Sequence, residues 1–280
     1  KDKLLKNPEE PNWLLLIGLI LCPLGLVEGH LYLVKGVVSD ISIDLTLQWH
    51  ALATFISGWC IILYSVAMLI TKTNRPFRNK WLYIVAAIGI LLDFGHHNYI
   101  SPQPHYFKII SFSATMLAIV SFFKHIKTYS NNKINTALLD QLRHVEFWTL
   151  FAVSTGILLA IPQINFYTHG TYAIVAHTMG SIIGVNSMII IIAGFQLANI
   201  NSQKTLYLFQ LFRISLILFC LPLFVLGIIF GILRVNNDIL YSISILRPYY
   251  ILISIFAIPL SIILPILCWI SIKGAWKKIR

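Results

Sequence analysis

The sequence predicts an all-α protein, a polytopic transmembrane helix bundle of about eight spans. Its 280 residues are 58% hydrophobic and only 11% charged, with a mean hydropathy of +0.79, which excludes an ordinary soluble domain. Several apolar runs also reach the roughly 20 residues that a helix needs to cross a bilayer core. The connections are short, so we expect one integral membrane domain over residues 1–280.

Each predicted span is an apolar run bounded by charged or polar residues. The first follows KDKLLKNPEEP and is too long for a signal peptide, the second follows DISID, and the third follows RNK. The fourth ends at KHIK, the short fifth follows QLRH, and the long sixth follows YTHG. The seventh follows NSQK, and the eighth begins after an Arg-Pro pair and ends near KGAWKK. In chain order the spans are 13–35, 46–70, 81–100, 106–127, 145–162, 171–198, 206–232 and 249–272.

The charge distribution gives the orientation of the spans. The chain has 21 lysines and arginines against 10 acidic residues, a net charge of +11. Basic residues gather before the first span, in every second connection and after the last span; in the remaining connections, Arg234 and Arg247 break this pattern. By the positive-inside rule, both termini lie in the cytoplasm. The basic charge therefore orients the chain in a lipid bilayer, and we expect no nucleic-acid partner.

Four histidines from three spans fall at one depth in this topology, roughly 5–10 Å below the outer face at 1.5 Å per helical residue. They are His50, His96, His97 and His177. Polar side chains within spans are costly unless they are paired, and they usually serve a function. Neutral imidazole is also the commonest side-chain metal ligand. The shared depth therefore predicts a metal or haem site near the outer face.

Other polar residues near the spans carry separate expectations. His30, at the outer end of the first span, is expected as a core or interfacial histidine, and His169 lies in an outer connection from which it could support the site. His144 lies near a cytoplasmic connection, where we expect a solvated position. Glu28 could carry protons on the outer side, whereas Glu146 is expected at the cytoplasmic interface.

Three stretches carry a family resemblance. IPQINFYTHGTYAIVAHTMGSIIGVNSM (161–188) resembles the helix, with its approach, that carries haem-ligating histidines in the catalytic subunit of bacterial nitric oxide reductase. WLYIVAAIGILLDFGHHNYISPQP (81–104) resembles the helix whose histidine pair binds the non-haem metal, and LQWHALATFISG (47–58) resembles the helix that supplies the third metal histidine. The chain thus resembles the last eight of twelve helices in this member of the haem-copper oxidase superfamily.

The resemblance implies a haem and non-haem metal site. His50, His96 and His97 would bind non-haem iron or copper, and His177 would be the axial ligand of a b-type haem. The family reaction couples two nitric oxide molecules to nitrous oxide, or reduces dioxygen. The resemblance further implies a multi-pass protein of the bacterial inner membrane, with other membrane subunits and with cytochrome c or quinol as electron donor.

One departure from the family pattern concerns a second haem. Family members have a second histidine two residues after His177, which binds a low-spin haem, and here this position is Met179. Met179 is expected either as core filler or as the ligand of a His/Met low-spin haem. The second ligand of such a haem would come from His30 or from another chain.

Further departures concern proton delivery. Nitric oxide reductases have a glutamate one turn after the first metal histidine, and here Thr54 follows His50 at this spacing. A second family glutamate is absent near Ala114. Asp93, in the turn before the histidine pair, could hydrogen-bond a ligand histidine or be satisfied by a neighbouring helix. Tyr99 is close to the site in sequence but matches neither oxidase pattern.

Three interpretations stay open. The chain is the catalytic part of a nitric oxide reductase-like or dioxygen-reducing enzyme, a haem- or metal-binding subunit for electron transfer or sensing, or a scaffold subunit of a larger respiratory assembly. We also expect other membrane subunits, or a missing N-terminal helical part, to pack on the first and last spans. Gly18, Gly25 and Gly29 share one face of the first span. This glycine face forms either a seam for such a partner or a contact with the chain's own helices.

Overall fold

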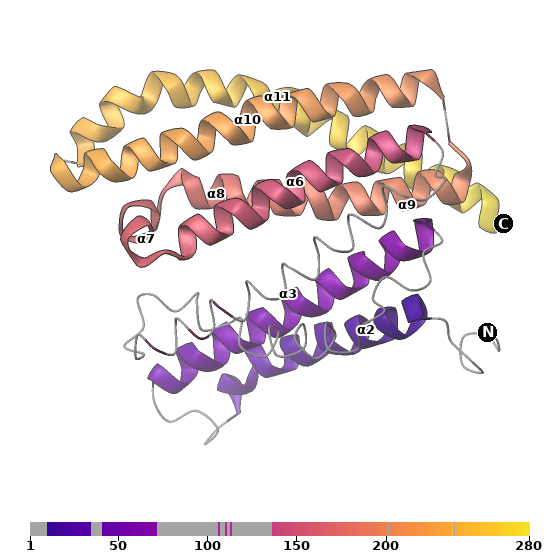
Figure 1. The fold of residues 1–280 in the computed structure, drawn as a ribbon, viewed down its shortest axis with the longest axis horizontal. Helices are drawn as coiled ribbons and strands as arrows, with labels where there is room; N and C mark the ends of the chain where they lie inside the picture. Colours follow the sequence, from indigo (N-terminus) through magenta and orange to yellow (C-terminus); the bar gives the residue numbers. More distant parts are fainter. Residues whose placement is uncertain are drawn as a thin grey trace. The chain divides into compact units, whose positions relative to one another are not determined.

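The structure is a computed structural model that describes residues 10–34, 41–71, 106, 110, 113, 136–200, 202–237 and 239–280. Every element within these residues is helical, as the sequence predicted (Figure 1). The chain divides into two compact units, Lys1–Lys133 and Ile134–Arg280. The single integral domain and the cytoplasmic placement of both termini stay predictions.

Five helical segments of the described residues are long and apolar enough to cross a membrane. They are Asn12–Gly29, His50–Ile70, Tyr172–Ala198, Gln203–Asn236 and Ile239–Lys278. These segments match the first, second, sixth, seventh and eighth predicted spans. The fifth predicted span falls on a more highly charged helix that is not among the five. The third and fourth lie outside the described residues, apart from residues 106, 110 and 113.

Two long helices form most of the described part of the first unit. Helix α2 (Glu10–Gly29) packs along helix α3 (Ile41–Thr71), and a short 3-10 helix, η1 (Leu31–Leu33), follows α2. Helix α2 therefore ends at Gly29, whereas the first span was predicted to run to residue 35. The apolar run continues past this point, but the chain turns at His30, whose Nδ1 lies 2.7 Å from the carbonyl of Leu26.

Glycines allow α2 and α3 to approach closely. A Cβ atom on Gly18 would lie 2.6 Å from the carbonyl oxygen of Gly58, and one on Gly25 would lie 2.7 Å from that of Ala51. Such distances are too short for any larger residue without a backbone shift. Gly18, Gly25 and Gly29 all face α3, so the interpretation of this glycine face as a seam for a partner chain is wrong.

We expect Gly25→Ala to destabilise the first unit and Gly29→Ala to be tolerated. The Gly25 methyl group would meet the α3 backbone, whereas at Gly29 the nearest atom to a new Cβ, the Cβ of Ala51, is 3.4 Å away. Overpacking of this kind typically costs about 1–3 kcal/mol. Thermal unfolding of the purified protein in detergent measures the difference, and equal midpoints for the two variants would contradict this packing.

The described part of the second unit consists of six helices and a π-helical segment. Helix α10 packs against both α8 and α11, α9 packs against α11, and the π-helix packs against α6 (Figure 1). The elements are α6 (Thr136–Ala160), α7 (Pro162–Thr168), α8 (Tyr172–Met179), the π-helix η3 (Gly180–Ser187), α9 (Met188–Ala198), α10 (Gln203–Asn236) and α11 (Ile239–Ile279).

Helix α6 begins well before the fifth predicted span, which started at residue 145. Its first turns carry Asp140 and Arg143, both exposed, and Asp140 lies 3.4 Å from Arg213 of α10 in an exposed ion pair. The apolar run begins only after these charges. Hydropathy therefore marks the apolar part of a helix, whereas backbone hydrogen bonding continues into the charged turns.

His144 is fully buried, and the expectation of a solvated position is wrong. Its ring meets the rings of Trp148, Phe209 and Phe212 edge to face, with centroids 5.6–6.3 Å apart. Neither ring nitrogen has a hydrogen-bond partner among the described residues. The histidine lies on the side of α6 that contacts Phe209 and Phe212 of α10. The packing of the helices therefore determines how exposed it is, and its nearness to a connection in the sequence does not.

Large apolar side chains are exposed along α2 and α11. Leu19 and Ile20 of α2 are 54% and 57% exposed, and Ile251 and Ile262 of α11 are 59% and 56% exposed. Monomeric soluble proteins rarely expose continuous apolar surface of this extent. The surface agrees with helices that lie in a lipid bilayer.

Candidate functional site

A tight turn fixes the start of helix α8, which carries His177. Gly170 has φ +70°, a conformation that favours glycine. Thr171 caps the helix: its hydroxyl donates to the carbonyl of Thr168 at 2.7 Å and accepts from the backbone N–H of Ala173 at 3.2 Å. The cap determines where α8 begins and therefore which way His177, its sixth residue, points.

The hydroxyl of Thr155 on α6 holds the ring of His177. The Oγ1 atom lies 2.8 Å from Nδ1 of His177 and 2.7 Å from the carbonyl oxygen of Phe151. A carbonyl can only accept, so the single hydroxyl hydrogen goes to Phe151 and Oγ1 accepts from Nδ1–H of His177. This arrangement places the lone pair of the neutral imidazole on Nε2, the nitrogen that a metal ion would bind.

Small residues make room around His177. A Cβ atom on Gly156 would lie 3.3 Å from Cε1 of the imidazole, so a side chain there would press on the ring. Gly180, at the start of the π-helix, lies against Phe151, whose ring carbon would be 2.7 Å from a Cβ atom at that position. π-helical segments are rare and often occur near functional sites.

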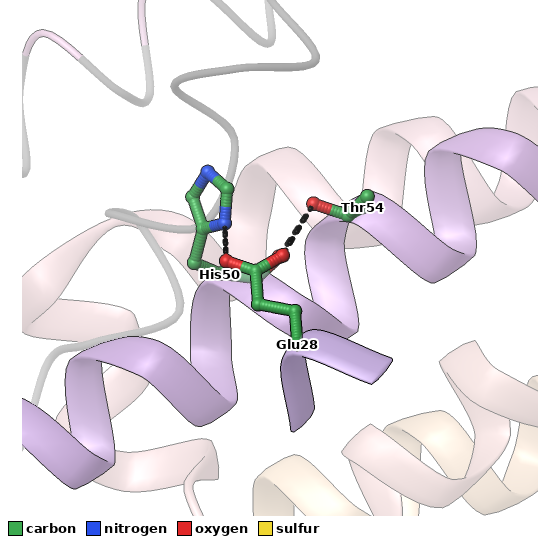
Figure 2. A network of polar contacts seen from close by, with 3 residues as sticks. All are labelled: Glu28, His50 and Thr54. Atoms are coloured by element: carbon green, nitrogen blue, oxygen red, sulfur yellow. Dashed lines mark hydrogen bonds and ion pairs between the residues drawn. The ribbon is translucent and has the colours of Figure 1, made fainter. Parts of the chain in front are cut away.

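His50 lies on α3 against a carboxylate from α2. Nδ1 of His50 contacts Oε1 of Glu28, and Oε2 of the same carboxylate lies 3.4 Å from the hydroxyl of Thr54 (Figure 2). The Thr54 hydroxyl is also 3.0 Å from the backbone carbonyl of His50. An ionised carboxylate only accepts, so Nδ1 of His50 donates and the lone pair of the neutral ring lies on Nε2. A carboxylate therefore stands beside Thr54, although it comes from another helix.

The donor chemistry of both histidines fits metal binding. Each is held at Nδ1 by a hydrogen-bond acceptor, an arrangement typical of ligating histidines because it fixes the tautomer and the ring orientation. Within the described ranges, no three histidine, cysteine, aspartate or glutamate side chains form a group that could hold a metal. His96 and His97, the other predicted metal ligands, lie outside these ranges, so the three-histidine set stays a prediction.

The remaining candidates are distributed differently. Asp93 and Tyr99 lie outside the described residues. Met179 is half-buried at the end of α8, and a helix turns about 200° over the two residues from His177 to Met179, so the two side chains lie on nearly opposite faces. His169 is exposed at the end of α7, where its carbonyl accepts from Arg234 at 2.5 Å.

Sequence reasoning missed two residues beside His177 and one contact of His50. Thr155 and Gly156 lie more than 20 residues before His177, in no motif, so only the packing of α6 on α8 reveals them. Glu28 was noted as an acidic residue near a span, but nothing in its spacing indicated that it would reach His50. The available signal was an acidic residue near the outer end of the span that precedes His50.

Comparisons with known proteins place the chain in a family. Residues 13–259 match the family described as Cytochrome C and Quinol oxidase polypeptide I. The chain is 21% identical over 168 residues to a nitric oxide reductase chain of Stutzerimonas stutzeri, an alignment that covers 54% of this chain and 35% of that protein. The chain thus spans about a third of the length of this relative.

A solved structure has a similar fold. A chain of a heme-copper terminal oxidase dimer determined by cryo-EM superimposes with a TM-score of 0.68 and 13% sequence identity, covering 95% of this chain and 56% of that one. At this identity the likeness concerns the fold. Because the family match extends over most of the sequence, the chain belongs to the cytochrome c and quinol oxidase polypeptide I family and is a haem-copper oxidase subunit I-like membrane protein.

Proposed function

We propose that this chain is the catalytic membrane part of a respiratory reductase that converts nitric oxide to nitrous oxide at a haem and non-haem metal site. His177 binds the iron of a b-type haem, and His50 binds non-haem iron or copper together with His96 and His97. The observation that carries the proposal is the Thr155–His177 hydrogen bond of 2.8 Å, which places the lone pair on Nε2. The Glu28–His50 contact has the same consequence for the second histidine.

The chemistry of the reaction defines what the chain must supply. The proposed histidine ligands would hold a haem iron and a non-haem metal, which would supply Lewis-acid and redox chemistry for the reduction of nitric oxide. Two nitric oxide molecules, two electrons and two protons yield one nitrous oxide and one water. Thr155 orients the His177 ring, and Glu28 orients the His50 ring.

Electrons must reach the proposed haem and metal site from an electron-carrying group that the proposed ligands do not hold. Met179 stands where the family pattern has a second haem-ligating histidine. We therefore propose that electrons arrive through another membrane subunit or through further helices of a longer protein, with cytochrome c or quinol as donor. The nitric oxide reductase chain of Stutzerimonas stutzeri, the relative named above, supports nitric oxide as the substrate.

The test is the composition and turnover of the purified protein in its native assembly. A pyridine haemochrome assay with metal analysis is expected to give a b-type haem bound by this chain and one non-haem iron or copper. A nitric oxide electrode with a reduced donor is expected to record consumption, with nitrous oxide as product. Dioxygen consumption without nitrous oxide would replace the proposal with a terminal oxidase, and absence of both haem and metal would leave a scaffold role.

A further inference from the structure

Glu28 is the acidic group that contacts a predicted site residue within the described part of the first unit. Its side chain is 18% exposed and that of His50 is 34% exposed, so the pair lies partly shielded between α2 and α3. One carboxylate oxygen contacts Nδ1 of His50, and the other lies 3.4 Å from the Thr54 hydroxyl (Figure 2). Both carboxylate oxygens thus face α3.

We propose that Glu28 is a positioning residue of the non-haem metal site. It accepts the Nδ1 hydrogen of His50, fixes the tautomer with the lone pair on Nε2, and makes the imidazole a more basic ligand. This inference rests on the proposed function, because it requires His50 to be a metal ligand. It adds helix α2 to the site and gives this chain a carboxylate beside Thr54.

The packing of α2 on α3 fixes the position of Glu28. Gly25, three residues earlier, lies against the α3 backbone, with a Cβ position 2.7 Å from the carbonyl oxygen of Ala51. One residue after Glu28, the carbonyl of Gly29 accepts from Nε2 of Gln48 at 2.7 Å. These contacts hold the end of α2 on both sides of Glu28. The backbone that carries Glu28 is therefore fixed by the packing of α2 on α3, and its carboxylate is only partly exposed. An exposed ion pair between two flexible side chains, by contrast, stabilises little.

A carboxylate at this place has a consequence for the metal that can be measured. A more basic imidazole binds a cation more tightly and stabilises its higher oxidation state. Loss of such a partner typically lowers metal affinity about 10–100-fold. The reduction potential of the non-haem metal should also shift upward, because a less basic imidazole stabilises the higher oxidation state less.

The experiment compares Glu28→Ala and Glu28→Gln with the wild type in the purified native assembly. Metal retained during stepwise chelation gives the affinity, and the metal's X-ray absorption edge during a redox titration gives the oxidation state. Glu28→Ala is expected to lose about 10–100-fold in retention and to shift the potential upward. Glu28→Gln, whose amide oxygen can still accept from Nδ1, is expected to recover most of the retention. Glu146→Gln, a half-buried carboxylate on α6, is the matched control and is expected to match the wild type.

The outcomes separate this inference from the proposed function. A wild-type protein without non-haem metal would overturn both. A metal-containing wild type with unchanged retention and potential in Glu28→Ala would overturn the role of Glu28 and leave the proposed function intact. The haem spectrum reports folding in each variant, and equal metal loss in Glu28→Ala and Glu28→Gln without a shift in potential would also contradict a positioning role.

Discussion

Replacing His177 with alanine is expected to abolish the haem absorbance of the purified protein and to reduce nitric oxide turnover to background. In the proposed function, His177 is the residue that binds the haem iron, and the methyl group of the alanine has no lone pair with which to replace it. The protein should still insert and remain helical, since each transmembrane helix satisfies its own backbone hydrogen bonds. Optical spectra normalised to protein concentration, together with circular dichroism, measure both expectations.

Two variants control this result. Thr155→Val removes the hydroxyl that lies 2.8 Å from Nδ1 while keeping nearly the same shape, so we expect the haem to remain but bind more weakly. His144→Phe replaces another histidine of the same unit, one that is packed among aromatic rings, and is expected to leave the haem spectrum unchanged. An unaltered spectrum in His177→Ala would show that the assignment of the haem ligand is wrong.

The helical architecture could be predicted from the sequence because apolar runs of bilayer length have few other structures available to them. The ends of the helices were predicted less well. Helix α6 extends through Asp140 and Arg143, whose charges lower the local hydropathy without interrupting the helix. Helix α2 stops at Gly29 within a run that is still apolar. Hydropathy reports where a chain can meet lipid, and it does not report where hydrogen bonding stops.

Contacts between helices could be predicted only in part. The spacing of Gly18 and Gly25 indicated a close helix contact, and the structure contains one, but with α3 and not with a partner chain. Glycine spacing shows that a backbone can approach, whereas the identity of the neighbour depends on the fold. His144 was misjudged for the same reason, because its burial comes from the rings of α10 that pack over it.

The candidate site shows a similar division. His50 and His177 were selected by residue type and predicted depth, which a sequence contains. Thr155 and Glu28 orient them from other helices, at separations of 22 residues in each case. No spacing rule within one helix could have identified either contact. The ligands of a membrane site are therefore more readily predicted than the groups that orient them.

Replacing His50 with alanine is expected to release the non-haem metal while the haem at His177 remains. Loss of a partner outside the ligand set typically lowers metal affinity about 10–100-fold, so loss of a ligand should lower it by at least about 100-fold. Nitric oxide turnover should fall with the metal content. Metal and haem analysis of the same sample measures both groups.

The control is the variant His30→Ala. His30 belongs to the same unit, is exposed, and has its Nδ1 near the carbonyl of Leu26. It is expected to keep both the metal and the haem, since it belongs to neither proposed ligand set. Because the His50 side chain is about one third exposed, added imidazole could enter the space left in His50→Ala and restore part of the metal binding. Full metal retention in His50→Ala would contradict its role as a ligand. Loss of haem together with the metal would contradict the assignment of the two groups to separate histidines, because only His177 is proposed to bind the haem iron.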